Sequence, residues 1–147
     1  ALTIAVMAIA FLIAGCGMGA ESNGNRGNGT TSTDEWRNIY GGPPVERWAA
    51  ATNQAEWDAM WASLGIEAPV ALADGLVGVG VFLGGRRSGG FAITIDSQKV
   101  EDGIFVVSYS EIAPGPNSVV TMALTAPYVI WTIADPGFQI IVEKTTP

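Results

Sequence analysis

The sequence predicts an α+β fold: a single domain in which one N-terminal amphipathic helix packs on a mostly antiparallel sheet of five or six strands. Two observations support this prediction. Apolar residues recur at helical spacing in one early stretch, residues 53–64. After Pro69 the chain changes to alternating, β-branched runs that are separated by short segments rich in Gly, Pro, Asn and Asp. One helix followed by successive strands favours α+β, because a parallel α/β sheet needs a helix between neighbouring strands.

The helix is expected over residues 53–64, after a short first strand at 45–50. Asn53 is a good N-cap, and Glu56 stands three residues later, as in a capping box. Gly65 lies where a glycine would end the helix. Apolar residues at helical spacing fill the stretch between these signals: Trp57, Met60, Trp61 and Leu64. We expect Trp57, Trp61 and Leu64 to face the core.

The later strands are bounded by turn-forming residues. We expect them at residues 76–83, 91–100, 104–111, 118–124, 127–134 and 138–144. Glu101-Asp102-Gly103 predicts a hairpin turn, and Asp135-Pro136-Gly137 predicts that the last two strands also form a hairpin. In the second strand, the alternating residues Phe91, Ile93 and Ile95 should share the core face.

The N-terminal segment predicts export. Residues 1–14 are apolar and uncharged, too short for a bilayer span but suited to the hydrophobic region of a signal peptide. Ile13-Ala14-Gly15-Cys16 resembles the bacterial lipobox, so Cys16 is the expected lipidation site and should hold the chain to a membrane through its acyl (palmitate-type) chains. Because the chain starts at Ala1 without Met or a basic region, we expect that the signal peptide is truncated.

Three segments follow from this pattern: a signal peptide at 1–15, a lipid anchor and flexible tether at 16–35, and a folded domain at 36–147. The tether is rich in Gly, Asn, Ser and Thr and has too few apolar side chains to bury a core. We therefore expect a lipoprotein of the bacterial cell envelope, at an outer membrane or cell surface.

Composition argues against several classes of function. The chain has no His, and its single Cys is the expected anchor, so neither a Ser-His-Asp triad nor a typical zinc site can be built. A net charge of −7 disfavours nucleic-acid binding. Carboxylates could serve a glycosidase or a divalent cation, and the candidates are Asp96, Glu101, Asp102 and Glu111. None forms a known motif, so we expect no catalytic residue, no metal and no cofactor.

The most distinctive local feature is the glycine-rich segment Gly84–Gly90, with Arg86, Arg87 and Ser88 at its centre. Clustered glycines let backbone amides converge, and guanidinium groups bind carboxylates or phosphates, so these three residues are candidate partner contacts. The alternative is a tight strand connection whose arginines are solvated or pair with acids of the same domain. The Lys-Ser/Thr ending of a phosphate-binding loop is absent.

Several short motifs follow one another in a distinctive order: Glu56–Trp61, Gly84–Phe91 with Ile93 and Ile95, Asp102-Gly103, Glu111, Pro114-Gly115 and Thr125–Tyr128. This order resembles the C-terminal domain of the protease-complex subunit PrcB family, and the resemblance covers residues 45–144. Ser88 occupies a position where the family usually has Thr or Ser before paired glycines. Arg86 and Arg87 precede it at positions where the family is often less basic.

The resemblance implies a non-catalytic, often lipid-anchored accessory protein; the family's namesake is associated with a surface subtilisin-like protease complex. The leading hypothesis is therefore a membrane-anchored binding or assembly module for an exported protease or another envelope protein. The alternative is an envelope domain that binds a small ligand or glycan, which an exposed cluster among Trp36, Tyr40, Trp48 and Tyr128 would favour. A carboxylate enzyme would need two acids converging in a cleft.

Overall fold

The computed structural model describes residues 34–146, which form a mostly β fold with one short helix and seven strands. The elements in chain order are β1 (Glu35–Asn38), β2 (Arg47–Ala51), α1 (Gln54–Ala62), β3 (Leu76–Phe82), β4 (Ala92–Glu101), β5 (Ile104–Ile112), β6 (Tyr128–Ala134) and β7 (Gln139–Lys144). Within these residues, no helix has the length and apolar character that crossing a bilayer would require.

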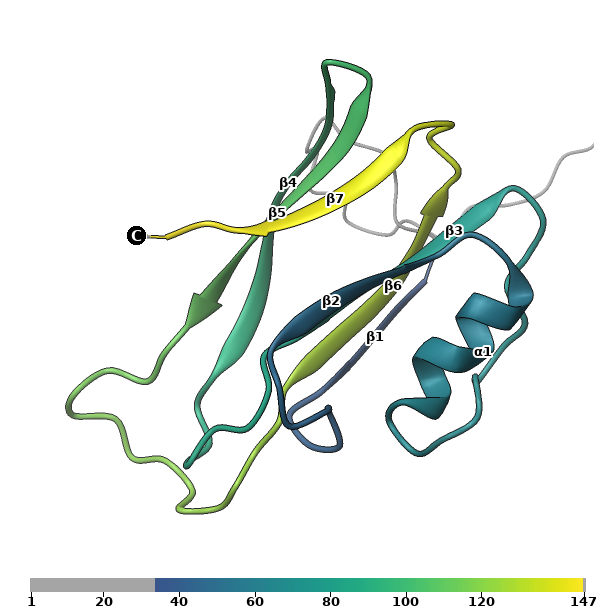
Figure 1. The fold of residues 1–147 in the computed structure, drawn as a ribbon. Coiled ribbons are helices and arrows are strands. Elements are labelled where there is room, and N and C mark those ends of the chain that lie inside the picture. The colour runs from purple at the N-terminus through teal and green to yellow at the C-terminus, as the bar shows by residue number, and fades with distance from the viewer. Residues whose placement is uncertain (1–33, 147) are drawn as a thin grey trace, which may run out of the picture.

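The strands form two sheets (Figure 1). The first has four strands in the order β1-β6-β3-β2, and all of its neighbours are antiparallel. The second has three strands in the order β4-β5-β7; β4 and β5 are antiparallel, whereas β5 and β7 run parallel. The prediction of mostly antiparallel pairing is therefore confirmed.

Two hydrophobic cores arrange these elements in three layers. The larger core lies between the two sheets and includes Val79 and Trp131 from the four-stranded sheet and Phe105 and Val142 from the three-stranded sheet. The smaller core lies on the other face of the four-stranded sheet, where α1 covers Phe82 and Ile130. The four-stranded sheet is thus buried on both faces, which explains why β3 and β6 are almost continuously apolar.

Helix α1 begins where the sequence predicts it. Asn53 has extended backbone angles, and its side chain accepts a hydrogen bond from the Glu56 backbone N–H at 3.0 Å. The Glu56 carboxylate accepts bonds from the backbone N–H of Thr52 at 2.7 Å and from the Thr52 hydroxyl at 2.9 Å. These bonds satisfy N–H groups at and just before the helix start, where the helix has no carbonyl partners for them.

The inner side of α1 carries an aromatic cluster. Trp57 and Trp61 are buried and contact the half-buried Trp36 of β1, with the three rings meeting edge to face at 5.5–5.7 Å between centroids. Leu64 lies partly buried against the same core. Gly78 of β3 makes room for this cluster, because an added Cβ would lie 2.4 Å from Cζ3 of Trp57.

The structure corrects the predicted single sheet. Seven strands in two sheets replace five or six strands in one, and the short strand β1 was missed. The predicted hairpin between the last two strands is wrong: the Asp135–Gly137 turn exists, with the Gly137 N–H donating to Oδ1 of Asp135 at 2.8 Å, but β7 joins the other sheet. Both edges of β6 are already occupied, by β1 and β3, so β7 pairs with β5 instead.

The predicted strand at 118–124 is also wrong, since this segment forms no strand. It lies within the long connection between β5 and β6 that returns the chain to the four-stranded sheet. The segment lies beside the glycine-rich connection after β3, and not beside the edge of a strand. The two segments share an isolated bridge between Arg86 and Thr125 and one hydrogen bond from the Gly89 N–H to the Thr121 carbonyl. A strand needs a continuous ladder of such bonds.

Candidate functional site

The glycine-rich segment connects the two sheets. It leaves β3 of the four-stranded sheet and enters β4 of the three-stranded sheet, next to the residues that precede β2. Gly84 has φ +76°, and a Cβ there would lie 2.7 Å from the Glu46 backbone nitrogen. The Gly85 N–H donates to the Pro44 carbonyl at 3.0 Å. Glycine at position 84 therefore allows this connection to approach the Glu46 backbone closely.

Arg86 uses every donor of its guanidinium group within the chain. Nε and Nη2 donate to the two carboxylate oxygens of Glu111, each at 2.8 Å, and Nη2 also donates to Glu46 at 3.3 Å. Nη1 donates to the carbonyls of Leu83 at 2.7 Å and Gly85 at 3.2 Å. A guanidinium group has five N–H donors. These five bonds leave Arg86 none for a partner in this conformation.

Lys144 and Tyr109 complete a cluster around the same acids. The Lys144 ammonium donates to Glu111 at 2.6 Å and to Glu46 at 2.8 Å, and the Tyr109 hydroxyl donates to Glu46 at 3.1 Å. We call these five residues, Glu46, Arg86, Tyr109, Glu111 and Lys144, the charged clamp. Glu46 precedes β2 and Arg86 follows β3, whereas the other three come from β5 and β7, so the charged clamp joins the two sheets.

The charged clamp holds both acids in their ionised form. The Arg86 guanidinium lowers the pKa of Glu111 to about 2, with Lys144 acting in the same direction against the effect of burial. Burial opposes ionisation of Glu46, but hydrogen bonds from Lys144, Tyr109 and Arg86 outweigh it and lower its pKa. Burial, together with the bond to Glu46, raises the pKa of the Tyr109 hydroxyl to about 12.

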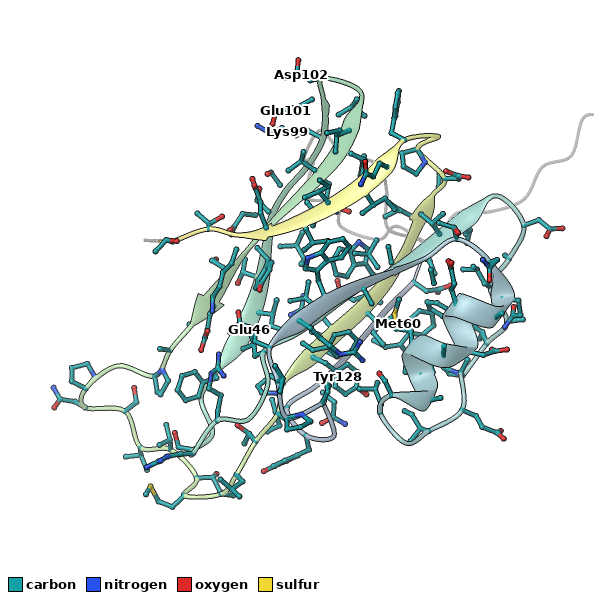
Figure 2. All side chains as sticks on the ribbon, in the orientation of Figure 1. Glu46, Met60, Lys99, Glu101, Asp102 and Tyr128 are labelled. Carbon is teal, nitrogen blue, oxygen red and sulfur yellow. The ribbon has the colours of Figure 1, made fainter. Side chains whose placement is uncertain are left out.

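This arrangement favours a structural role over acid–base chemistry. Glu46 and Glu111 do converge, but a general acid needs a carboxyl group whose pKa is raised, and here both are lowered. Glu101 pairs with Lys99 at the far tip of the β4–β5 hairpin, distant from Glu46 in Figure 2. Among residues 34–146, no group of three or more His, Cys, Asp or Glu side chains is placed to hold a metal ion.

The other candidate partner contacts behave differently from Arg86. Arg87 is exposed, and its side chain forms no ion pair within residues 34–146. Ser88 is half-buried, and its hydroxyl donates to the Gly89 carbonyl at 3.2 Å while its own carbonyl accepts from the Thr125 hydroxyl at 2.8 Å. Of the three residues, Arg87 is the one that presents a free cation to solvent.

Next to Arg87 lies an apolar surface that sequence reasoning missed. Val119, Met122 and Leu124 are 102%, 88% and 80% exposed. The sequence predicts a strand over residues 118–124, which the structure does not form. We call residues 118–124 the apolar loop; it protrudes beside the glycine-rich segment at the end of the molecule that is lowest in Figure 1.

The aromatic rings do not form the exposed cluster that would favour the ligand-binding alternative. Trp36 is half-buried against the α1 tryptophans, and Tyr128 is 8% exposed. Tyr40 and Trp48 are exposed, but Tyr40 follows edge strand β1 and Trp48 lies in the opposite edge strand, β2. A groove of about 570 Å³ lies elsewhere, between α1 and residues 66–71, with Asp58 and Glu67 as its charged residues.

The residues predicted for the core lie as follows. Trp57, Trp61 and Ile93 are buried, and Leu64, Phe91 and Ile95 pack partly buried against the two cores. Phe91 also stacks against the Arg86 guanidinium, at 5.6 Å from the ring centroid. Cys16, the predicted lipidation site, lies outside the described residues, as do the predicted signal peptide and most of the tether.

Part of the chain is similar to a known family. Residues 78–134 match the family model described as PrcB C-terminal. This confirms the predicted resemblance over β3 to β6, a stretch that includes Arg86, Arg87, Glu111 and the apolar loop. It leaves out α1, β1, β2 and β7, and with them Glu46 and Lys144. Searches of curated proteins and of solved structures found no match.

Proposed function

We propose that this chain, whose residues 78–134 match the PrcB C-terminal family model, is a non-catalytic accessory subunit of an exported protease complex. The family match carries this proposal, because the family's namesake is associated with a protease complex. The geometry is compatible with it: the best-organised polar group, the charged clamp, stabilises the fold rather than presenting a reactive side chain.

In the same proposal, Cys16 anchors the chain to the cell envelope. The supporting observation is the sequence alone: an apolar run at residues 1–14 that ends in Ile13-Ala14-Gly15-Cys16. A single acyl chain binds a bilayer weakly, whereas two or more hold a protein firmly. An anchored subunit would keep its protease partner at the membrane.

The anchor predicts a change of fractionation in one variant. Full-length protein should enter the detergent phase on phase separation, and Cys16→Ala should shift to the aqueous phase or remain as an uncleaved precursor. Mass spectrometry of the N-terminal peptide should show acyl chains on Cys16. Ser32→Ala is the matched control and should behave as the unchanged chain. An unmodified Cys16 would contradict the lipoprotein proposal.

The accessory role is tested by mild detergent extraction of the tagged full-length chain, followed by quantitative mass spectrometry. A protease recovered in fixed stoichiometry, and pulled down reciprocally by its own tag, is the expected result. Recovery of the chain alone under several extraction conditions would contradict the accessory role. Arg87→Ala tests whether the exposed arginine contributes to this contact; Lys99→Ala, a cation at the far hairpin, is its control.

A further inference from the structure

The apolar loop exposes more large apolar side chains than is usual for a surface that contacts only water. Three large aliphatic side chains, Val119, Met122 and Leu124, are almost entirely in solvent. Single exposed apolar residues are ordinary, but several together on one protruding segment mark a contact with a protein or a membrane.

The backbone of the loop is held in place at three points. The Ser118 N–H donates to the Gly115 carbonyl at 3.0 Å, and the Gly89 N–H donates to the Thr121 carbonyl at 2.8 Å. Thr125 forms the isolated bridge with Arg86 that closes the loop onto the charged clamp. The exposed side chains are therefore presented by a fixed backbone rather than by a free end.

The apolar loop is uncharged, although the whole chain is strongly acidic. The net charge is −7, yet no charged residue occurs between Glu111 and Asp135, so the loop carries neither acid nor base. Arg87, the exposed cation, lies on the segment that is hydrogen-bonded to the loop. An uncharged apolar tip with a cation at its margin complements a bilayer that contains anionic lipids, because the apolar groups enter the interface while the cation stays at the headgroups.

We propose that the apolar loop inserts Val119, Met122 and Leu124 into the interfacial region of an anionic lipid bilayer, with Arg87 at the level of the headgroups. This goes beyond the accessory role and assigns the domain an orientation on the membrane. It rests on the proposed envelope location for its access to lipid. The alternative occupant, an apolar cleft of a protein partner, is an outcome of the test below.

The geometry of the chain allows the loop and Cys16 to reach the same membrane. Because β1 is antiparallel to β6, the chain enters the four-stranded sheet at the end opposite the apolar loop (Figure 1). The longest strands of this sheet, β3 and β6, have seven residues each, which corresponds to a length of about 23 Å. Residues 17–33 between Cys16 and Asp34 can span at most about 60 Å. This reach exceeds the length of the sheet.

The test places a fluorescent probe in the loop of the full-length chain. Met122→Trp is reconstituted into vesicles of phosphatidylcholine and phosphatidylglycerol, with and without lipids brominated near the headgroup end of the acyl chains. Val100→Trp is the control, because Val100 is also an exposed apolar residue but lies at the far hairpin between Lys99 and Glu101 (Figure 2). The fluorescence of the unchanged chain, which has five Trp residues, is subtracted.

The expected result is a blue-shifted emission and a strong loss of the added fluorescence with brominated lipid for Met122→Trp, and neither change for Val100→Trp. Arg87→Ala in the Met122→Trp background should weaken the effect on anionic vesicles but not on purely zwitterionic ones. Flotation of the same samples measures attachment of the chain separately from insertion of the loop.

Three results would overturn the proposal. If the chain floats with the vesicles but the Met122→Trp indole stays unquenched and accessible to aqueous acrylamide, the anchor stands and loop insertion fails. If that indole is shielded from acrylamide in membranes of the producing cell but not in lipid vesicles, the loop binds a protein partner instead of lipid. If neither variant floats, both the anchor and the insertion of the loop are excluded, whereas the accessory role remains open to co-purification.

Discussion

Arg86 and Arg87 are adjacent in sequence and have opposite environments. The Arg86 guanidinium is fully hydrogen-bonded between Glu111 and Glu46, with its side chain 20% exposed, whereas Arg87 is exposed to solvent. A bidentate arginine–carboxylate pair of this kind is among the stronger polar interactions in a protein. The two residues are therefore expected to differ sharply when replaced.

Arg86→Ala should lower the free energy of unfolding by about 2–3 kcal/mol, because it leaves the partly buried Glu111 and Glu46 carboxylates with Lys144 as their remaining cation. Arg87→Ala, the matched control, should stay within about 0.5 kcal/mol of the unchanged chain. Urea unfolding followed by tryptophan fluorescence measures both. Equal effects of the two replacements would contradict the roles assigned to them.

At the scale of elements, the stability of α1 depends on how closely it approaches β3. A nine-residue helix is marginal alone in water, so it depends on packing of its buried residues, Trp57, Met60 and Trp61, on the sheet. Gly78 permits this approach, and the Trp57 indole N–H donates to the Val70 carbonyl at 2.8 Å, which holds the segment after the helix against it.

Gly78→Ala should therefore destabilise the domain by about 1–3 kcal/mol, because the new methyl group overlaps a buried indole. Gly85→Ala is the control, since the nearest atom to its added Cβ is 3.8 Å away, and it should change stability by less than about 0.5 kcal/mol. Chemical denaturation and near-ultraviolet circular dichroism report the change. If Gly78→Ala leaves the free energy of unfolding unchanged, α1 does not pack on β3 as described.

At the scale of the whole molecule, the charged clamp links the two sheets beside the larger core. Glu46 and Arg86 belong to connections of the four-stranded sheet, and Glu111 and Lys144 to strands of the other sheet. Protonating the acids would remove attraction between the sheets. The charged clamp should therefore make the stability of the two packed sheets depend on pH.

The direction follows from Glu111, whose pKa is lowered from 4.5 to about 2 in the folded chain. A lowered carboxyl pKa contributes stability that is fully present above 4.5 and is lost as the pH falls towards 2. Urea midpoints measured from pH 7 to pH 2 should fall most steeply within that window. Glu111→Gln should be less stable at pH 7 and should show a shallower fall; an unchanged pH profile would contradict the ionised state of Glu111.

Local signals in the sequence predict the helix and most of the strands of this protein. Capping residues predict the helix start at Asn53, and helical periodicity predicts the inward-facing tryptophans. Turn residues predict the hairpin at Asp102-Gly103 and the bounds of most strands. Each of these signals acts between residues that are neighbours in the chain, so they can be read without knowledge of distant contacts. The order of short motifs was sufficient for the family resemblance that the match at residues 78–134 confirms.

The pairing of the elements depends on contacts between distant parts of the chain. Strand β7 leaves its expected hairpin because both edges of β6 are taken, and residues 118–124 form no strand because no complete edge is available to them. Glu46 and Lys144 join the charged clamp although they are 98 residues apart. Strand partners and ion pairs depend on which strand edges and charged side chains come together in the folded chain. Local sequence signals therefore do not predict them.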